Sequence, residues 1–301
     1  MNRQDIHTIN DFNKRMCQPT LHPLIAVIDP VRLREGDRLR FSGNFYAVYF
    51  KHTQCGDRCY GRRPQDFQYG TLVFAAPGET IRIDREDAIQ EGLTGLLFSP
   101  ELFSQKSLVF KKTDYTFFAY KDNESLHLSL QERHLVQDCM EHIYTELQHD
   151  VDRFSLRLIA VGLEMLLDNC LRFYERQFIV RTDINRQYLS TLDNALESYL
   201  SQTGKKSVEQ GVACIRHSLP SLSSAYLSDL IRVETGKALT EYIRIKMLEC
   251  IRIRIQSRNQ PIEELAEEFG FYDPRTLLVL YHKLFGQRLE EHTQIANYNL
   301  N

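Results

Sequence analysis

A helix–turn–helix pattern that occurs twice in the last third of the 301-residue chain restricts the fold more than any other sequence feature. In each copy a helix is followed by a tight turn, a second helix and a glycine; we expect the second helices over Ser224–Val233 and Pro274–Phe285. Gly236 and Gly286 can end them because glycine tolerates the left-handed backbone. A further helix, Thr240–Ser257, is expected to join the copies. Because the turn sets the second helix crosswise to the first, that helix can enter the major groove of DNA.

The chain of 301 residues is about twice the usual domain length. Before the tail, it shows two other residue patterns. From about Leu24 to Tyr120, short runs of β-branched and aromatic residues are broken by Gly and Pro, which indicates a β-sandwich or barrel. Ser129 and Glu132 form a capping box that begins one helix, and a second helix is expected from about Ser155. A linker is expected near Thr182 to Arg186, before the helical tail. These patterns predict an α+β multidomain protein.

The doubled unit resembles the DNA-binding domain of the AraC family of bacterial transcription regulators. The resemblance in the tail rests on Tyr226-Leu227-Ser228-Asp229-Leu230, Glu234-Thr235-Gly236-Lys237, Glu241-Tyr242-Ile243, Glu264-Leu265-Ala266-Glu267-Glu268-Phe269-Gly270-Phe271 and Lys283-Leu284-Phe285-Gly286. The run 172–178 resembles the interdomain segment of one subgroup, and segments between 60 and 77 resemble its sensor domain. The resemblance implies a cupin-like β-barrel sensor domain over 1–125, a helical connector and dimerisation segment over 126–182, and a double helix-turn-helix DNA-binding domain over 183–301.

The same resemblance implies the partners of the chain. They are double-stranded promoter DNA, RNA polymerase and a small-molecule effector of the sensor domain. It also implies a homodimer through the Ser129–Arg176 helices. The apolar stripes of these helices can instead pack on the chain's own β-domain, so the stripes alone leave both arrangements open.

Candidate DNA-contacting residues lie on or beside both second helices. In the first unit, Ala225, Ser228 and Asp229 match the base-reading positions of the family; Ala can touch a thymine methyl group, and Ser and Asp can meet base edges. The predicted interface consists of Ser224, Ala225, Ser228, Asp229, Arg232, Lys237, Arg275, Thr276 and Lys283. Phosphate contacts are expected from the clustered cations Arg232, Lys237, Arg244, Lys246, Arg252, Arg254 and Arg258.

The tail also departs from the family pattern. Leu278 and Val279 are expected on the exposed face of the second helix, where the family commonly has a small polar residue and an arginine. Residues 204–293 hold 13 Lys and Arg against 12 Asp and Glu, a net charge of +1, which is weak for a DNA-binding domain. We therefore expect the first unit to supply most of the sequence readout. The alternative is a sensor or protein-interaction module whose tail binds DNA only weakly.

An effector pocket is expected on one face of the strand around Phe45–His52. Alternation places Tyr46, Val48 and Phe50 together on that face, which predicts an aromatic pocket without metal. His7, His22 and His52 are the only histidines in the first 125 residues, too few and too scattered for a metal-dependent cupin.

We expect no catalytic residues and no cofactor, and hence no enzyme. A remote alternative is a redox or metal site built from His52, Cys55 and Cys59. The seven scattered cysteines, the polar N-terminus and the absence of a long apolar run predict a cytoplasmic protein that does not enter membranes.

Overall fold

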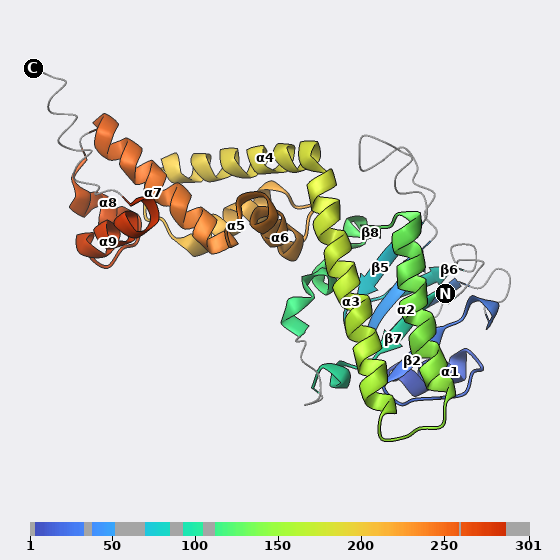
Figure 1. Cartoon of the computed structure of the whole chain (residues 1–301). Coiled ribbons are helices and arrows are strands. Elements are labelled where there is room, and N and C mark those ends of the chain that lie inside the picture. The colour runs from blue at the N-terminus through green and yellow to red at the C-terminus, as the bar shows by residue number, and fades with distance from the viewer. Residues whose placement is uncertain are drawn as a thin grey trace, which may run out of the picture. The chain divides into compact units, whose positions relative to one another are not determined.

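The computed structural model describes residues 4–32, 38–51, 70–84, 93–104, 112–258 and 260–286 (Figure 1). Its contacts divide the chain into two compact units, Met1–Arg181 and Thr182–Asn301. The two helices of the predicted connector belong to the first unit. The finer division into 1–125, 126–182 and 183–301 stays a prediction.

In its described residues, the first unit combines strands with three α-helices. In chain order its main elements are β1 (Gln4–Asp5), α1 (Ile9–Arg15), β2 (Ile25–Ile28), β3 (Arg38–Ser42), β4 (Tyr46–Lys51), β5 (Thr71–Ala75), β6 (Ile81–Asp84), β7 (Gly95–Phe98), the 3-10 helices Pro100–Ser104 and Thr116–Ala119, β8 (Leu126–His127), α2 (Leu130–Gln148) and α3 (Ser155–Val180). The described strands form a three-stranded sheet, β1-β3-β6, and a five-stranded sheet, β2-β7-β4-β5-β8.

The two sheets share one apolar core. Strand β4 lies between β7 and β5, with Ala47 opposite Leu97 on one side and Ala75 on the other. Ala47 and its neighbours on that face join Phe41 of the three-stranded sheet and Phe12 of α1 in a buried cluster. The alternating pattern of β4 thus buries one face between the sheets.

The strands of the described residues form these two sheets and do not close into a barrel, so the predicted cupin-like barrel is not confirmed. The physical reason lies in the pattern itself. An alternating strand buries its apolar face equally well inside a barrel or against a second sheet. Strand periodicity predicted the β-rich unit but did not determine its closure.

Helices α2 and α3 pack against each other, and α3 lies across the five-stranded sheet (Figure 1). The predicted capping box is confirmed: the Ser129 hydroxyl accepts from the Glu132 amide, and the Glu132 carboxylate accepts from the Ser129 amide. The α2–α3 crossing is close at Gly162, where a Cβ atom would lie 2.9 Å from Cγ1 of Ile143. Tyr174 of α3 contacts the ring of Phe74 on β5.

The second unit is entirely helical in its described residues. It contains α4 (Thr182–Ser201), α5 (Val208–Ser218), α6 (Ser224–Thr235), α7 (Leu239–Arg258), α8 (Ile262–Glu268) and α9 (Pro274–Phe285). The expected linker at Thr182–Arg186 is wrong, because α4 begins at Thr182 and only Arg181 separates it from α3. The expected second helices are confirmed, with α9 beginning and ending where the sequence predicts.

No helix in the part of the chain described above is long and apolar enough to cross a membrane. The alternative site of His52, Cys55 and Cys59 lies outside the described residues.

Candidate nucleic-acid interface

Helices α5 and α6 form the first helix-turn-helix unit. Ser223 caps α6, its hydroxyl accepting from the Tyr226 amide at 3.0 Å. Gly236 ends the helix with a left-handed φ of 69°. The apolar side of α6, which includes Leu230 and Ile231, is buried, so the opposite side is the one that a ligand can reach.

The predicted α6 residues divide into accessible and internal ones. Ser224 is exposed, and Ala225 and Ser228 are half-buried. The side chain of Asp229 is only 7% exposed and pairs with Arg232 at 2.9 Å, whereas that of Arg232 is 59% exposed. Asp229 is therefore placed to orient the Arg232 guanidinium rather than to present a free carboxylate to a base edge.

Beyond α6, the candidate cation Lys237 is exposed but forms an ion pair with Glu241 at 3.2 Å. Both side chains of this pair are well solvated, so the pairing is weak and the ammonium group can exchange to a phosphate.

Helices α8 and α9 form the second unit. Gly270 turns the chain between them with a φ of 72°, and a Cβ atom there would lie 2.9 Å from the Lys206 carbonyl oxygen. Asp273 caps α9 by accepting from the Thr276 amide at 2.8 Å. This hydrogen bond is the largest cause of the lowered pKa of Asp273, and it stabilises the N-terminal turn.

The predicted α9 residues Arg275, Thr276 and Lys283 are all exposed. Val279, expected to be exposed, is 69% exposed. Leu278, for which the same was expected, is half-buried, and the sequence expectation for it is wrong. Leu278 lies next to Leu277, which is fully buried, so the apolar side of α9 extends further around the helix than the pattern suggested.

Two of the cations expected to contact phosphate form ion pairs inside the unit. Lys246 pairs with Asp193 of α4 at 2.9 Å. Arg254 is buried, pairs with Glu268 of α8 at 2.7 Å, and donates to the Leu200 carbonyl oxygen at the end of α4. Both residues join α7 to its neighbouring helices α4 and α8, so these charges help to hold the second unit together.

Helix α4 contributes contacts to α6 and α7 that were not predicted from the sequence. The Tyr242 hydroxyl donates to Asp193, and Asn185 donates to Glu234 at 2.8 Å. Burial, together with the Asp193 carboxylate, raises the pKa of Tyr242. Each of these pairs joins residues 49 positions apart, a separation at which no local sequence signal marks a contact.

In the first unit, the predicted effector face is densely packed. Tyr46, Val48 and Phe50 are essentially fully buried. The ring of Tyr46 lies 5.3 Å from that of Phe98 and 4.7 Å from that of Phe118, measured between centroids. These side chains form part of the core between the sheet and the segments that cover it.

A cavity of about 290 Å³ lies elsewhere in the first unit, between the segment after α1, strand β2 and the end of α2. Gln18 is among its lining residues. The Gln18 amide nitrogen donates to Asn13 and to the Val27 carbonyl oxygen, while its buried Oε1 has no hydrogen-bond partner among the described residues. Asp29, Arg32 and Tyr144 add further polar groups to the lining.

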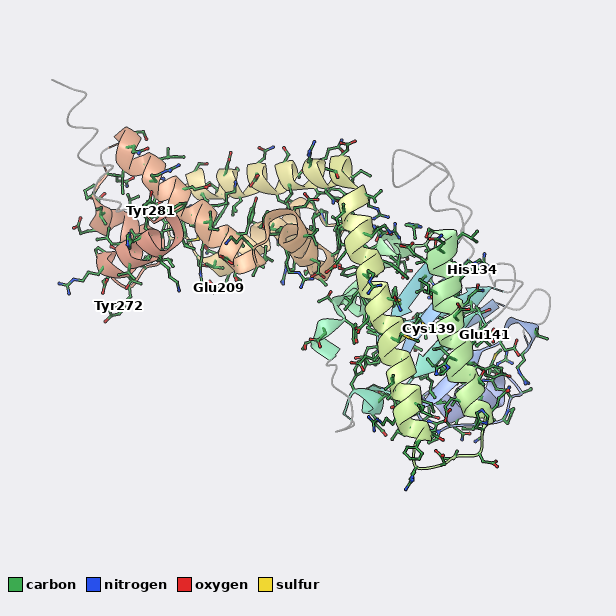
Figure 2. The ribbon with its side chains drawn as sticks, in the orientation of Figure 1. His134, Cys139, Glu141, Glu209, Tyr272 and Tyr281 are labelled. Carbon is green, nitrogen blue, oxygen red and sulfur yellow. The ribbon has the colours of Figure 1, made fainter. Side chains whose placement is uncertain are left out.

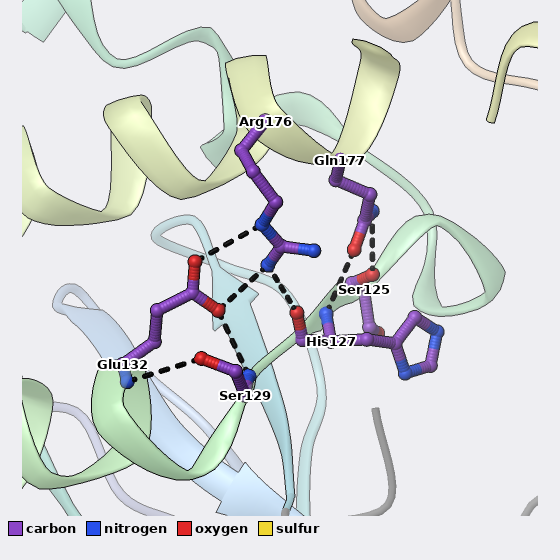
Figure 3. Close-up of polar contacts among 6 residues, drawn as sticks. All are labelled: Ser125, His127, Ser129, Glu132, Arg176 and Gln177. Carbon is purple, nitrogen blue, oxygen red and sulfur yellow. Dashed lines mark hydrogen bonds and ion pairs between the residues drawn. The ribbon is translucent and has the colours of Figure 1, made fainter. Parts of the chain in front are cut away.

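A polar cluster fastens α3 to the start of α2 (Figure 3). Arg176 donates to both carboxylate oxygens of Glu132, at 3.0 and 2.8 Å, and to the His127 carbonyl oxygen at 2.8 Å. Gln177 accepts from the His127 amide at 2.9 Å. Burial, with the charges of Arg181 and Arg176, lowers the pKa of the His127 side chain to about 4.

Comparison with known proteins gives one local similarity. No family model matches the chain. Over 63 residues the chain is 33% identical to the multiple antibiotic resistance protein MarA of Escherichia coli K12 and to that of Salmonella typhimurium LT2. The match covers 21% of this chain, which spans about half the length of these curated relatives. A crystal structure of apo ToxT from Vibrio cholerae aligns over 89% of this chain and 96% of its own, but the 12% identity and the TM-score of 0.27 are too low to establish a shared fold.

Proposed function

We propose that the chain is a DNA-binding transcription regulator of the AraC type, with a binding rather than a catalytic role. The observation that carries this proposal is the pair of helix-turn-helix units, each with a capped second helix whose polar face is accessible. The local similarity to MarA, an AraC-family protein, supports it. Promoter DNA is the proposed partner of α6 and α9, and RNA polymerase is the proposed protein partner.

The test is selection of binding sites from random-sequence duplex DNA with the full chain, followed by shift titrations over a range of salt. Specific binding should weaken as salt rises, because phosphate contacts release counterions. Arg232→Ala should reduce the slope of log K against log salt by about 0.9 in magnitude. Arg172→Ala, which removes an exposed arginine of the first unit, is the matched control and should leave the slope unchanged. Failure to enrich any sequence, with no binding at low salt, would contradict the proposal.

A weakly DNA-binding sensor or interaction module is the second candidate function. Two observations favour it: Lys246 and Arg254 are used internally, and Val279 exposes an apolar side chain. The same selection separates the two candidates, because an interaction module enriches no sequence.

The proposed regulator acts as a homodimer through its long helices. Helix α3 exposes Leu158, Val161 and Met165, which follow one another at intervals of three and four residues. Residues so spaced lie on one face of a helix, and an apolar face left in water is stabilised by pairing with a second copy.

A small-molecule effector is proposed to enter the cavity beside Gln18 rather than the packed face of Tyr46, Val48 and Phe50. The unpaired Gln18 Oε1 calls for a ligand that carries an O–H or N–H donor. A hydroxylated compound found by melting-temperature screening should stabilise the wild type but not Leu21→Trp, which places a bulky ring at the rim of the cavity. Equal stabilisation of both would place the effector elsewhere.

A further inference from the structure

We infer that α9 reads thymine methyl groups in the major groove through Val279. This inference rests on the proposed DNA-binding function and names the base feature that the second helix-turn-helix unit recognises. Tyr272, two residues before α9, projects outward and is 98% exposed, whereas Tyr281 within α9 is fully buried (Figure 2).

Three exposed residues form a stripe along α9: Arg275, Val279 and Lys283. They are four residues apart, so they lie on neighbouring turns of one helix face. The rise of about 1.5 Å per residue puts Arg275 and Lys283 about 12 Å apart along the helix axis. The stripe therefore carries a cation at each end, within reach of phosphates, and an apolar group at its centre that can face the bases.

The charge of α9 favours nucleic acid over a protein as the occupant of this face. The helix contains Arg275, His282 and Lys283 and no Asp or Glu. An apolar partner protein would have to bury both exposed cations, whereas DNA meets both with phosphates.

The chemistry of the groove then selects the base. Val279 cannot donate or accept a hydrogen bond, so it cannot distinguish the polar edges of bases. The apolar group that the major groove presents is the C5-methyl group of thymine. Thr276, exposed three residues before Val279, offers a second methyl group on the same side of the helix.

The experiment replaces each dT by dU, one position at a time, in a duplex selected by the full chain. This change removes the methyl group and leaves base pairing and hydrogen bonding unchanged. We expect one or two positions in the half of the site next to α9 to lose about fourfold in affinity, the effect of about one buried carbon group.

The same dT and dU duplexes are then titrated with variants of the protein. In Val279→Ala the dT/dU affinity ratio at those positions should fall towards one, and Val279→Thr, which keeps one methyl group, should retain part of it. Ile253→Ala is the matched control, because Ile253 is an exposed apolar residue of α7 (56% exposed) and should keep the wild-type ratio. Unfolding curves confirm that each variant is folded.

Two results would overturn the inference while leaving the proposed function standing. One is specific binding that is unchanged by dU at every position. The other is a dT preference that persists in folded Val279→Ala, since the methyl groups are then contacted by another residue. Failure to enrich any sequence would instead remove the proposed function itself.

Discussion

Arg176 is the residue on which the polar attachment of α3 to α2 depends. It engages both oxygens of Glu132 and a main-chain carbonyl oxygen, in a setting where its side chain is 27% exposed and that of Glu132 is 14% exposed. A carboxylate that loses such a partner retains its desolvation cost without compensation. The cluster therefore matters more than a solvent-exposed ion pair would.

Arg176→Ala should lower the free energy of unfolding of the first unit by about 2–3 kcal/mol, because it leaves Glu132 half-buried and without this guanidinium. Arg172→Ala, on the same helix but exposed, should change it by no more than about 0.5 kcal/mol. Urea unfolding followed by circular dichroism measures both. Equal effects of the two substitutions would show that the cluster contributes no more than the solvated surface.

His127 makes the stability of the same region depend on pH. Its pKa is about 4 in the folded protein against 6.5 for an unperturbed histidine, so the folded state favours the neutral ring. Stability is complete above pH 6.5 and is lost as the pH falls from 6.5 towards 4, where the unfolded chain gains a proton first. The loss amounts to about 3 kcal/mol.

His127→Gln should remove this part of the pH dependence between pH 7 and 4. The main-chain contacts of residue 127 with Gln177 and Arg176 survive the substitution, because they use its amide and carbonyl groups. Comparison with the wild type subtracts the carboxylates that titrate over the same range. If the curves of unfolding free energy against pH run parallel for the two proteins, His127 is not the source of this pH dependence.

At the scale of elements, the second unit depends on close contact between helices. Gly211 of α5 faces Ile243 of α7, and a Cβ atom there would lie 2.8 Å from Cγ2 of Ile243. Because α5 is the first helix of its helix-turn-helix unit, its distance from α7 also fixes where α6 begins. A larger residue at position 211 would disturb stability and DNA binding together.

Gly211→Val should destabilise the second unit by about 1–3 kcal/mol through overpacking, despite the better helix propensity of any non-glycine residue. Ala213→Val, at an exposed position of the same helix, should cost about 0.5 kcal/mol. Thermal unfolding compares them. If Gly211→Val is as stable as Ala213→Val, then α5 and α7 can move apart at little cost in stability.

What the sequence could predict depends on how local the signal is. The limits of α9 and the cap at Ser129 follow from residues three or four positions apart, and the sequence predicted both. The pairing of Asp229 with Arg232 is equally local. Whether the Asp229 carboxylate can also reach a base depends on its burial, which the sequence pattern does not show. The contacts of Asp193 and the closure of the sheets depend on segments far apart in the chain, and no local pattern predicts them.

At the scale of the whole molecule, the exposed stripe of α3 bears on assembly. The mass of one chain is 35.3 kDa. Light scattering should give about twice that mass for the wild type, and the monomer mass for Val161→Glu/Met165→Glu, because two carboxylates cannot be buried against their symmetry mates. Val31→Glu, at a highly exposed apolar residue outside α3, should remain dimeric. A wild type that stays monomeric at high concentration would contradict the homodimer.

The position of α4 sets where this chain can be cut and recombined. Its Asn185 and Asp193 side chains contact Glu234 and Tyr242, so a fragment that starts at α5 leaves those partners without their contacts. A junction at Arg181 keeps every one of them. In evolutionary exchange, as in the making of chimaeras, a tail module that begins at Thr182 therefore keeps these contacts, which a module that begins at α5 loses.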